Sequence, residues 1–518
     1  MTKFIIVLGT TSHSGKSTLV AGLCRIFSDR GLKVAPFKSQ NMSLNSWVTS
    51  AGKEMGIAQA VQAWAARVEP TEQMNPILLK PKGDRTSQVI VFGEPVADKS
   101  AEQYYKEING LKSVVDEAVA GLEQEYDYVV VEGAGGAAEI NLYDRDLANT
   151  YISNKLGAPI ILVADIERGG VFASLYGTVM LLRPEIRSLV KGLVINKFRG
   201  DPGILMPGLK ELEDLTGIPV LGVMPYLDLT LPSEDSVSLG DKKPRGIKSA
   251  RMVKSAKKSD ETADQVEEVE IAIVRLPRIS NFTDFEQLER EAHVRYVTPG
   301  EPLGEPDAVI IPGTKNTVSD LEEMRKRGTD KEILALRKKG VPILGICGGY
   351  QIIGREIIDL GIENTTATIL GLGLLDLTTH FDRYEKRTVQ VKKTVTGDGP
   401  ILGPIKGETV WGYEIHMGKT DSREPAAFED DGAVGEGGLV LGTYLHGIFQ
   451  NDNFKNAFLD FLYRQKNLTR KASASGDGYD ELASDMVRYL DMEQIWKMVD
   501  LEPPQEDDEN EAVRENID

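Results

Sequence analysis

The stretch from Phe4 to Arg30 constrains the fold of this chain more than any other. The apolar run Phe4 to Leu8 is typical of a short buried strand, the glycine-rich segment GTTSHSGKST follows from Gly9 to Thr18, and helical spacing begins at about Leu19. A strand, a glycine-rich loop and a helix in this order place backbone N–H groups and a helix N-terminus around phosphate oxygens. Later strand-length and helix-length segments alternate, which predicts a mostly parallel sheet covered by helices on both faces.

The glycine-rich loop carries the side chains that a nucleotide site needs. Lys16 is predicted to reach the β and γ phosphates of ATP, and the hydroxyl of Ser17 is predicted to ligate Mg²⁺. Glu132 ends the apolar strand Tyr128 to Val131 and is predicted to be the second metal partner, although a helix-capping carboxylate would also suit this position. The residues expected to bind ATP lie in the loop and after the next strand: Gly9, Gly15, Lys16, Ser17, Thr18 and Lys38.

A second glycine-rich junction, VPILGICGGYQIIG, runs from Val341 to Gly354. Its apolar half indicates a buried strand, its glycines suit a tight turn, and the residues from Tyr350 to Ile358 have helical spacing. Cys347 at this turn is the candidate nucleophile, because a helix N-terminus lowers the pKa of a thiol and stabilises an oxyanion. The alternative, a small core residue, is the interpretation preferred for Cys24.

A cysteine nucleophile needs a base, and the sequence contains five histidines. His446 is preferred because it ends the apolar run LVLGTYL and precedes a glycine, which places it at the carboxyl end of a strand. His416 is the competitor, and His380 is a distant third. The backbone N–H groups expected to bind the oxyanion are those of Gly348, Gly313 and Thr314.

The cysteine turn with its downstream histidine resembles the class I glutamine amidotransferase domain, which hydrolyses glutamine to release ammonia. The acidic residue usually found two positions after that histidine is replaced by Ile448, so the imidazole is expected to be held by packing or by a backbone carbonyl. The N-terminal loop also departs from the usual spacing, because five positions rather than four separate Gly9 from Gly15. That longer loop resembles dethiobiotin synthetase and its relatives, P-loop enzymes that phosphorylate a carboxylate or carbamate.

Length and charge limit the classes of protein that fit. A chain of 518 residues exceeds what one hydrophobic core usually supports. The formal net charge of −19 argues against nonspecific binding to nucleic acid or anionic membranes. Two cysteines in different contexts do not form a disulfide framework, no signal peptide is evident, and no run approaches the roughly 18 apolar residues of a membrane span. A cytoplasmic protein is expected.

The chain is predicted to divide into two α/β domains and three further segments. The segment between the domains is expected to be a linker or surface excursion, since its portion from about 241 to 267 is charged and lacks apolar periodicity. The predicted units are a P-loop domain at 1–232, the linker at 233–269, a glutamine amidotransferase-like domain at 270–465, a helical extension at 466–500 and a disordered acidic tail at 501–518.

Nine blocks taken together resemble one family, the cobyric acid synthases, over residues 4 to 465. They are FKSQNMSLNS, MNPILLKP, EGAGGAAEINLYDRDLAN, ADIERGGVFAS, VINKFRGD, RLPRISNFTDF, GICGGYQ, GYEIHMG and GTYLHG. The resemblance implies glutamine- and ATP-dependent amidation of the b, d, e and g carboxylates of adenosylcobyrinic acid a,c-diamide. It also implies that the partners are small-molecule substrates and that ATP and Mg²⁺ are required.

An anionic corrinoid calls for basic or amide groups near the nucleotide, although each such residue alone is more often a structural or surface ion-pair residue. The candidates are Asn41, Arg145, Arg168, Lys197, Arg199, Arg275 and Arg278. Two rival functions remain. Cobyrinic acid a,c-diamide synthase has the same chemistry but resembles RLPRISNFTDF and FKSQNMSLNS less well. A P-loop partitioning ATPase with an inert C-terminal domain is disfavoured because Cys347 and His446 are retained.

Overall fold

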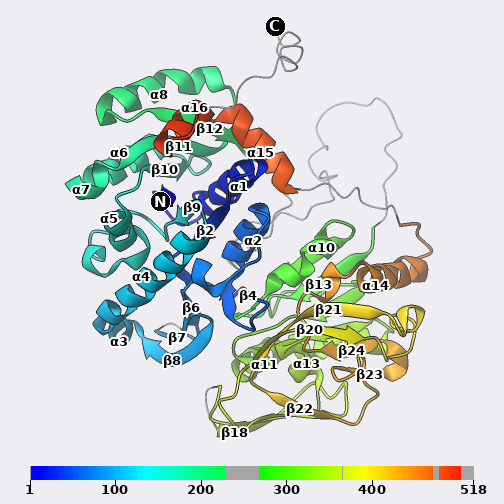
Figure 1. The fold of residues 1–518 in the computed structure, drawn as a ribbon. Helices are drawn as coiled ribbons and strands as arrows, with labels where there is room; N and C mark the ends of the chain where they lie inside the picture. The colour runs from blue at the N-terminus through cyan, green and yellow to red at the C-terminus, as the bar shows by residue number, and fades with distance from the viewer. Residues whose placement is uncertain (1, 84, 228–267, 364–365, 471–477, 503–518) are drawn as a thin grey trace, which may run out of the picture.

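The computed structural model describes residues 2–83, 85–227, 268–363, 366–470 and 478–502. Most of the expected linker at 233–269 and nearly all of the acidic tail lie outside these residues. The described chain forms two α/β bodies side by side, one from residues 2–227 together with the C-terminal residues 478–502 and one from residues 268–470 (Figure 1). No helix within the described ranges is both long and apolar enough to cross a membrane.

The first body is built on a parallel sheet of six strands. Apolar side chains of β1 alternate, so that Ile5 and Val7 pack with one buried cluster while Ile6 and Leu8 pack with another. Helices therefore cover both faces, as predicted (Figure 1). The strand order is β12 (Val220–Pro225), β11 (Val190–Phe198), β10 (Ile160–Asp165), β1 (Lys3–Gly9), β9 (Tyr128–Glu132) and β2 (Val34–Phe37).

Two element boundaries differ from the sequence-based prediction. Helix α1 (Lys16–Asp29) begins three residues earlier than expected, directly after Gly15, whose φ of 104° makes the turn out of the loop. The Ala- and Gln-rich stretch from Glu54 to Val68 is also predicted from its sequence to be helical, but it begins with the short strand β5 (Glu54–Gly56), which pairs with β4 (Ser46–Val48), and only then enters α2 (Ile57–Ala65). The other helices of this body are α3 (Ala101–Lys106), α4 (Ile108–Glu125), α5 (Ile152–Leu156), α6 (Val171–Leu181), α7 (Pro184–Arg187) and α8 (Pro202–Thr216).

A smaller sheet extends the first body beyond the end of β2. It consists of β3 (Gln40–Met42), β6 (Ile77–Pro81), β7 (Thr86–Val91) and β8 (Glu94–Ser100), in that order. Together with the β4–β5 pair, this sheet faces the second body (Figure 1).

The second body is built on another six-stranded sheet, parallel except for the edge strand β23. Its order is β14 (His293–Val297), β13 (Glu270–Val274), β15 (Ala308–Ile311), β16 (Ile343–Ile346), β24 (Val440–Thr443) and β23 (Ala433–Gly435). Helices of this body include α10 (Glu286–Glu289), α11 (Thr317–Arg327), α12 (Thr329–Lys338), α13 (Gly348–Ile353) and α14 (Asp452–Gln465). Two smaller sheets complete it: β18 (Thr366–Leu370), β17 (Glu356–Leu360), β19 (Leu377–Phe381) and β22 (Lys419–Ser422) form one, and β20 (Arg387–Thr394) with β21 (Thr409–His416) forms the other.

The helix after Cys347 is shorter than its spacing predicts. It was expected to run to Ile358 but ends at Ile353, because Gly354 is extended and Glu356 already pairs with its neighbours in β17. A Cβ at Gly354 would lie 2.2 Å from Leu377, so the chain turns here against β19 with no room for a side chain.

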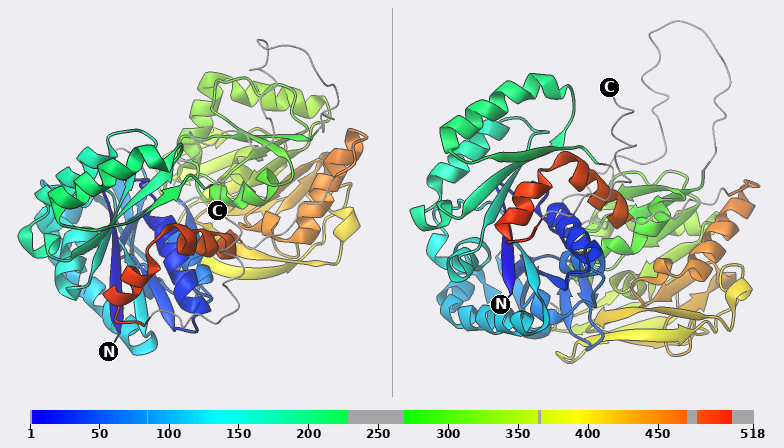
Figure 2. Two further views of the ribbon diagram at one scale, coloured as in Figure 1. Left: turned by 90° about the horizontal axis from the view of Figure 1, so that it is seen from above. Right: turned by 45° about the horizontal axis from the view of Figure 1, so that its top comes forward.

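The last described helices return to the first body. Helices α15 (Gly478–Tyr489) and α16 (Met492–Met498) lie against α1 and β12, as both views in Figure 2 show. Their apolar residues Leu482, Met486 and Trp496 belong to the cluster that contains Phe27 of α1. A Cβ at Gly22 would lie 2.0 Å from the sulfur of Met486, so α1 and α15 are in close contact at that glycine.

Candidate active site

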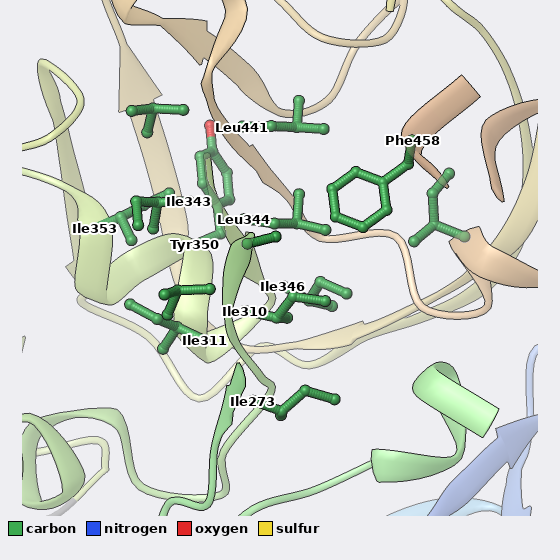
Figure 3. Packing of buried hydrophobic residues seen from close by; sticks show 14 of the residues in the cluster. Ile273, Ile310, Ile311, Ile343, Leu344, Ile346, Tyr350, Ile353, Leu441 and Phe458 are labelled. Atoms are coloured by element: carbon green, nitrogen blue, oxygen red, sulfur yellow. The ribbon is translucent and has the colours of Figure 1, made fainter. Parts of the chain in front are cut away.

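Cys347 occupies a strained turn between β16 and α13. Its backbone has φ 52° and ψ −107°, a conformation that non-glycine residues rarely adopt, and its N–H donates to the carbonyl of Thr443 at 2.8 Å. The glycines around it are required by packing, because a Cβ on Gly349 would lie 1.9 Å from the carbonyl oxygen of Ile311. Ile310, Ile343 and other buried aliphatic side chains form the core around β16 (Figure 3), and Cys347 belongs to the same buried cluster.

His446 lies beside this thiol, and the interaction between the two side chains contributes to raising the pKa of the imidazole. It follows β24, the neighbour of β16 in the parallel sheet, which brings both residues to the same edge. His446 is 1% exposed. Burial alone would lower the pKa of its imidazole, but the carboxylate of Asp284 and the interaction with Cys347 outweigh burial and raise that pKa to about 10.

Asp284 holds the imidazole of His446, which corrects the expectation of packing or a backbone carbonyl. Its Oδ2 lies 2.7 Å from Nδ1 of His446, and its Oδ1 accepts the N–H of Gly447 at 2.8 Å. Asp284 comes from the short helix η4 (Phe282–Phe285) rather than from the position after the histidine, where Ile448 is buried in the core. The block RISNFTDF contains this aspartate, but 162 residues of sequence separate it from its histidine.

The residues predicted to bind an oxyanion are gathered at the same turn. A Cβ on Gly348 would lie 3.0 Å from the backbone nitrogen of Thr314, and a Cβ on Gly313 would lie 3.1 Å from Cε1 of His446. The Thr314 loop is held by Asp320, which accepts a hydrogen bond from the Thr314 hydroxyl. This arrangement suits the stabilisation of a tetrahedral intermediate formed at Cys347.

The two competing histidines occupy different positions. His416 stacks on Tyr444 at 3.7 Å, and its Nδ1 lies 2.8 Å from the carbonyl oxygen of Gly418. The residue before it, Ile415, provides the carbonyl oxygen that lies 3.5 Å from the sulfur of Cys347. His380 on β19 faces Asp421 at 3.7 Å and is more exposed. His446 is the histidine that the structure joins to both the thiol and a carboxylate.

The other cysteine, Cys24, lies in the interior of α1 and is fully buried, as predicted for a core residue. Burial, reinforced by the charge of Glu132, raises the pKa of its thiol far above the usual range. Both cysteines are free thiols.

The predicted nucleotide loop ends at the N-terminus of α1 and faces Glu132. The hydroxyl of Ser17 donates to Glu132 at 2.9 Å, and the ammonium of Lys38 donates to the same oxygen at 2.8 Å. The second oxygen of Glu132 accepts from Gln62 of α2 at 2.5 Å. Lys16 donates to the carbonyl of Thr11 at 2.9 Å, so its ammonium lies across the mouth of the loop.

A Mg²⁺ ion fits the residues present at this loop. Ser17 supplies a hydroxyl oxygen, and Glu132 supplies a carboxylate. Because Glu132 ends the strand β9 and bonds the Ser17 side chain, it does not cap a helix, which was the alternative. Within the described ranges, no group of three or more His, Cys, Asp and Glu side chains is placed to hold a metal. Two protein oxygens suit Mg²⁺ because this ion usually takes its remaining ligands from phosphates and water.

The corrinoid candidates do not form one cluster. Lys197 lies near the end of β11, and Arg199 and Arg168 lie just beyond the ends of β11 and β10, at the same sheet edge as the nucleotide loop, whereas Arg145 lies farther along the chain, in the short helix η2 (Tyr143–Arg145). Lys197 pairs with Asp165 at 2.8 Å, and Arg199 lies 3.5 Å above the ring of Tyr226.

Asn41 and Arg278 also have partners within the protein. Asn41 is buried and donates to Gln59 at 3.0 Å. Arg278 lies in the other body, where it pairs with Asp320 at 2.9 Å beside the Thr314 loop.

Comparison with known proteins assigns both bodies. Residues 5–237 match the CobQ/CobB/MinD/ParA nucleotide binding domain, and residues 270–454 match the CobB/CobQ-like glutamine amidotransferase domain. The solved structure of PurLQS from Thermotoga maritima shares 19% identity over 38% of this chain and 100% of that chain, with a TM-score of 0.30, too low to relate the whole folds.

Full-length relatives are much more similar. A probable cobyric acid synthase of Methanosarcina mazei is 57% identical over 500 residues, which cover 96% of this chain and 99% of the relative. That of Methanococcoides burtonii is 58% identical over 506 residues, 97% of this chain and 98% of the relative. With these similarities, and with a nucleotide loop and a cysteine–histidine–aspartate site in one chain, the protein belongs to the cobyric acid synthase family.

Proposed function

We propose that the protein uses glutamine and ATP to amidate the b, d, e and g carboxylates of adenosylcobyrinic acid a,c-diamide, giving adenosylcobyric acid. The observation that carries the proposal is the presence of two complementary sites in one chain: the buried Cys347–His446–Asp284 group and the Lys16–Ser17–Glu132 group. The family assignment supports a corrinoid as the substrate.

The glutaminase half-reaction begins with the thiolate of Cys347 attacking the carboxamide carbon of glutamine. The carbonyl oxygen becomes an oxyanion, for which Gly348 and the Thr314 loop are the proposed N–H donors. The imidazolium of His446 gives its proton to the leaving nitrogen, so ammonia departs and a thioester remains. Water, deprotonated by His446, then cleaves the thioester to glutamate and regenerates the thiol.

The synthetase half-reaction solves a different chemical problem. A carboxylate is a poor electrophile at neutral pH, so its oxygen first attacks the γ phosphate of ATP, releasing ADP and forming an acyl phosphate. Ammonia attacks the acyl carbon, phosphate leaves, and a proton is lost to give the amide. Lys16 is the proposed group that neutralises charge on the transferred phosphoryl group. A Mg²⁺ ion held by Ser17 and Glu132 would supply further charge neutralisation.

Two variants separate the half-reactions. Cys347→Ala is expected to abolish amidation with glutamine while retaining amidation at high ammonium concentration, because only ammonia release needs the thiol. Lys16→Ala is expected to lose amidation with either nitrogen source, on the order of a thousandfold in rate, while still hydrolysing glutamine.

The measurement is mass spectrometry of the products formed from the a,c-diamide, ATP and either nitrogen source. Four successive mass decreases of one OH-to-NH₂ exchange each are expected for the wild-type protein. Full glutamine-dependent turnover by Cys347→Ala would exclude that residue as the nucleophile. Amidation of a and c carboxylates in cobyrinic acid, without reaction of the a,c-diamide, would instead identify a cobyrinic acid a,c-diamide synthase.

A further inference from the structure

Two asparagines, one from each body, exchange hydrogen bonds across the interface. The side-chain oxygen of Asn45 accepts the backbone N–H of Phe282 at 3.1 Å. The side-chain oxygen of Asn281 accepts the backbone N–H of Ser46 at 2.9 Å. Both asparagines are nearly fully buried. Each therefore satisfies a backbone donor of the other body that would otherwise be buried without an acceptor.

The Asn281 side of this contact leads directly to the catalytic histidine. Asn281 has φ 52° and precedes η4, the short helix that begins at Phe282 and contains Asp284. Asp284 in turn bonds both His446 and the N–H of Gly447. A four-residue helix has little stability of its own, so its position depends on contacts such as the one from Asn45.

The Asn45 side leads to the nucleotide site. Asn45 lies between β3 and β4, seven residues after Lys38, and its backbone carbonyl accepts the N–H of Ile57 at 3.2 Å. Ile57 is the first residue of α2, which carries Gln62 to the carboxylate of Glu132. The segment from Lys38 to Asn45 is thus linked to Glu132 at both ends. Lys38 bonds Glu132 directly, and Asn45 bonds α2, which carries Gln62.

A second set of contacts between the two bodies is made by aromatic rings. The ring of Trp47 lies 4.9 Å from that of Trp64 in α2 and 4.9 Å from that of Tyr413 in β21. Tyr413 stacks on His446 at 5.4 Å, and the two residues exchange backbone hydrogen bonds at 2.9 and 3.1 Å. The first body therefore contacts two neighbours of His446 in the second body: the helix η4, which carries Asp284, and Tyr413.

We propose that Asn45 and Asn281 are positioning residues for the glutaminase site, and that their reciprocal hydrogen bonds across the interface fix η4 so that Asp284 stays against His446. The cysteine site is then fully assembled only when the two bodies are docked. This inference rests on the proposed glutaminase function of Cys347 and names interface residues that control it.

The test compares full-length Asn281→Gly with Gln390→Ala. Glycine adopts the backbone conformation of Asn281 without strain, so the variant removes the side-chain bond alone. Gln390 is the comparison, because its carboxamide also crosses the interface, donating to the carbonyl of Val48 at 2.7 Å, but it lies on β20, opposite Tyr413 of β21, rather than in η4.

Glutamine hydrolysis is measured over a range of pH, together with amidation at high ammonium. Asn281→Gly is expected to lower kcat for glutamine hydrolysis about tenfold with KM changed less than about twofold, because the site is misassembled rather than unable to bind. The limb of the pH profile that reports His446 should move to lower pH as Asp284 withdraws. Gln390→Ala should change kcat less than about twofold and leave the profile in place.

Three results would count against the inference. Unchanged hydrolysis in Asn281→Gly would exclude a positioning role, and equal losses in Asn281→Gly and Gln390→Ala would assign the effect to general loosening of the interface. A fall in kcat without a shift of the pH profile would separate Asn281 from Asp284. Cys347→Ser is measured alongside these variants. Glutamine hydrolysis by Cys347→Ser at the wild-type rate would refute the proposed function itself.

Discussion

At the scale of single residues, the protonation state of His446 sets the charge of the imidazole beside Cys347. The carboxylate of Asp284 and the neighbouring Cys347 raise the pKa of the imidazole to about 10, against the lowering effect of burial. The imidazole is therefore expected to stay protonated at neutral pH, where in the proposed mechanism it protonates the leaving nitrogen. Asp284 does more than orient the ring, because its charge sets this protonation state.

Asp284→Asn tests that role. The variant keeps an oxygen that can accept from Nδ1 but removes the charge, so the pKa of His446 should fall toward its ordinary value near 6.5. We expect kcat/KM for glutamine to fall on the order of a hundredfold. Wild-type activity should persist through neutral pH and be lost as pH rises through about 10, whereas the variant should lose activity at lower pH. Identical pH profiles would show that Asp284 does not control the imidazole.

At the scale of elements, the C-terminal helices complete the first body although they follow the second in sequence. Leu482 and Met486 of α15 and Trp496 of α16 are buried against α1, with the ring of Trp496 5.1 Å from that of Phe27. Gly22 permits this close approach. Since α1 begins at the nucleotide loop, these helices support the element that positions Lys16 and Ser17.

Leu482→Ala and Val487→Ala make a matched pair on α15. Leu482 is fully buried, so its truncation should lower the free energy of unfolding of the first body by about 2–4 kcal/mol. Val487 is 55% exposed, so its truncation should cost less than about 0.5 kcal/mol. Both changes in the free energy of unfolding are measured by urea unfolding, monitored by hydrogen exchange of the α1 amides. Equal stabilities would mean that α15 is not part of the folded core of the first body.

At the scale of the whole molecule, a buried ionic group joins the two bodies. Glu54 of β5 accepts from Lys80 of β6 at 2.6 Å and from Lys386, which comes from the second body. Burial would raise the pKa of the Glu54 carboxyl, but Lys386 and Lys80 outweigh it and hold that pKa far below its usual range. Because the Glu54 carboxyl takes up a proton only in strong acid, the stabilisation it provides should persist through mildly acidic pH.

Glu54→Gln should loosen the interface because it leaves two lysines buried without their anion. The expected cost is about 3–5 kcal/mol. Hydrogen exchange in β4, β5 and β20 should accelerate relative to wild type. Glu94→Gln is the control, since Glu94 pairs with Lys53 on the surface, where loss of an ion pair costs about 0–1 kcal/mol. Similar exchange in the two variants would show that Glu54 does not hold the bodies together.

Features that depend only on neighbouring residues could be predicted from the sequence alone. Alternating apolar segments predicted two α/β bodies with parallel sheets, and the spacing of glycines around Lys16 and Cys347 predicted both turns. These predictions hold because strand periodicity and glycine conformation are local properties. The same local patterns gave less accurate boundaries where tertiary contacts intervene, as at Gly354, where packing against Leu377 ends α13 early.

Contacts between residues far apart in the sequence could not be predicted and are seen only in the folded structure. Asp284 reaches His446 across 162 residues, Asn45 reaches Phe282 across 237, and α15 returns to α1 from the far end of the chain. The isoleucine at position 448 led to the expectation that no carboxylate holds the imidazole, and the fold supplies one from another loop. A buried imidazolium requires a nearby anion whatever its place in the sequence, and chain topology determines which aspartate lies within hydrogen-bonding distance.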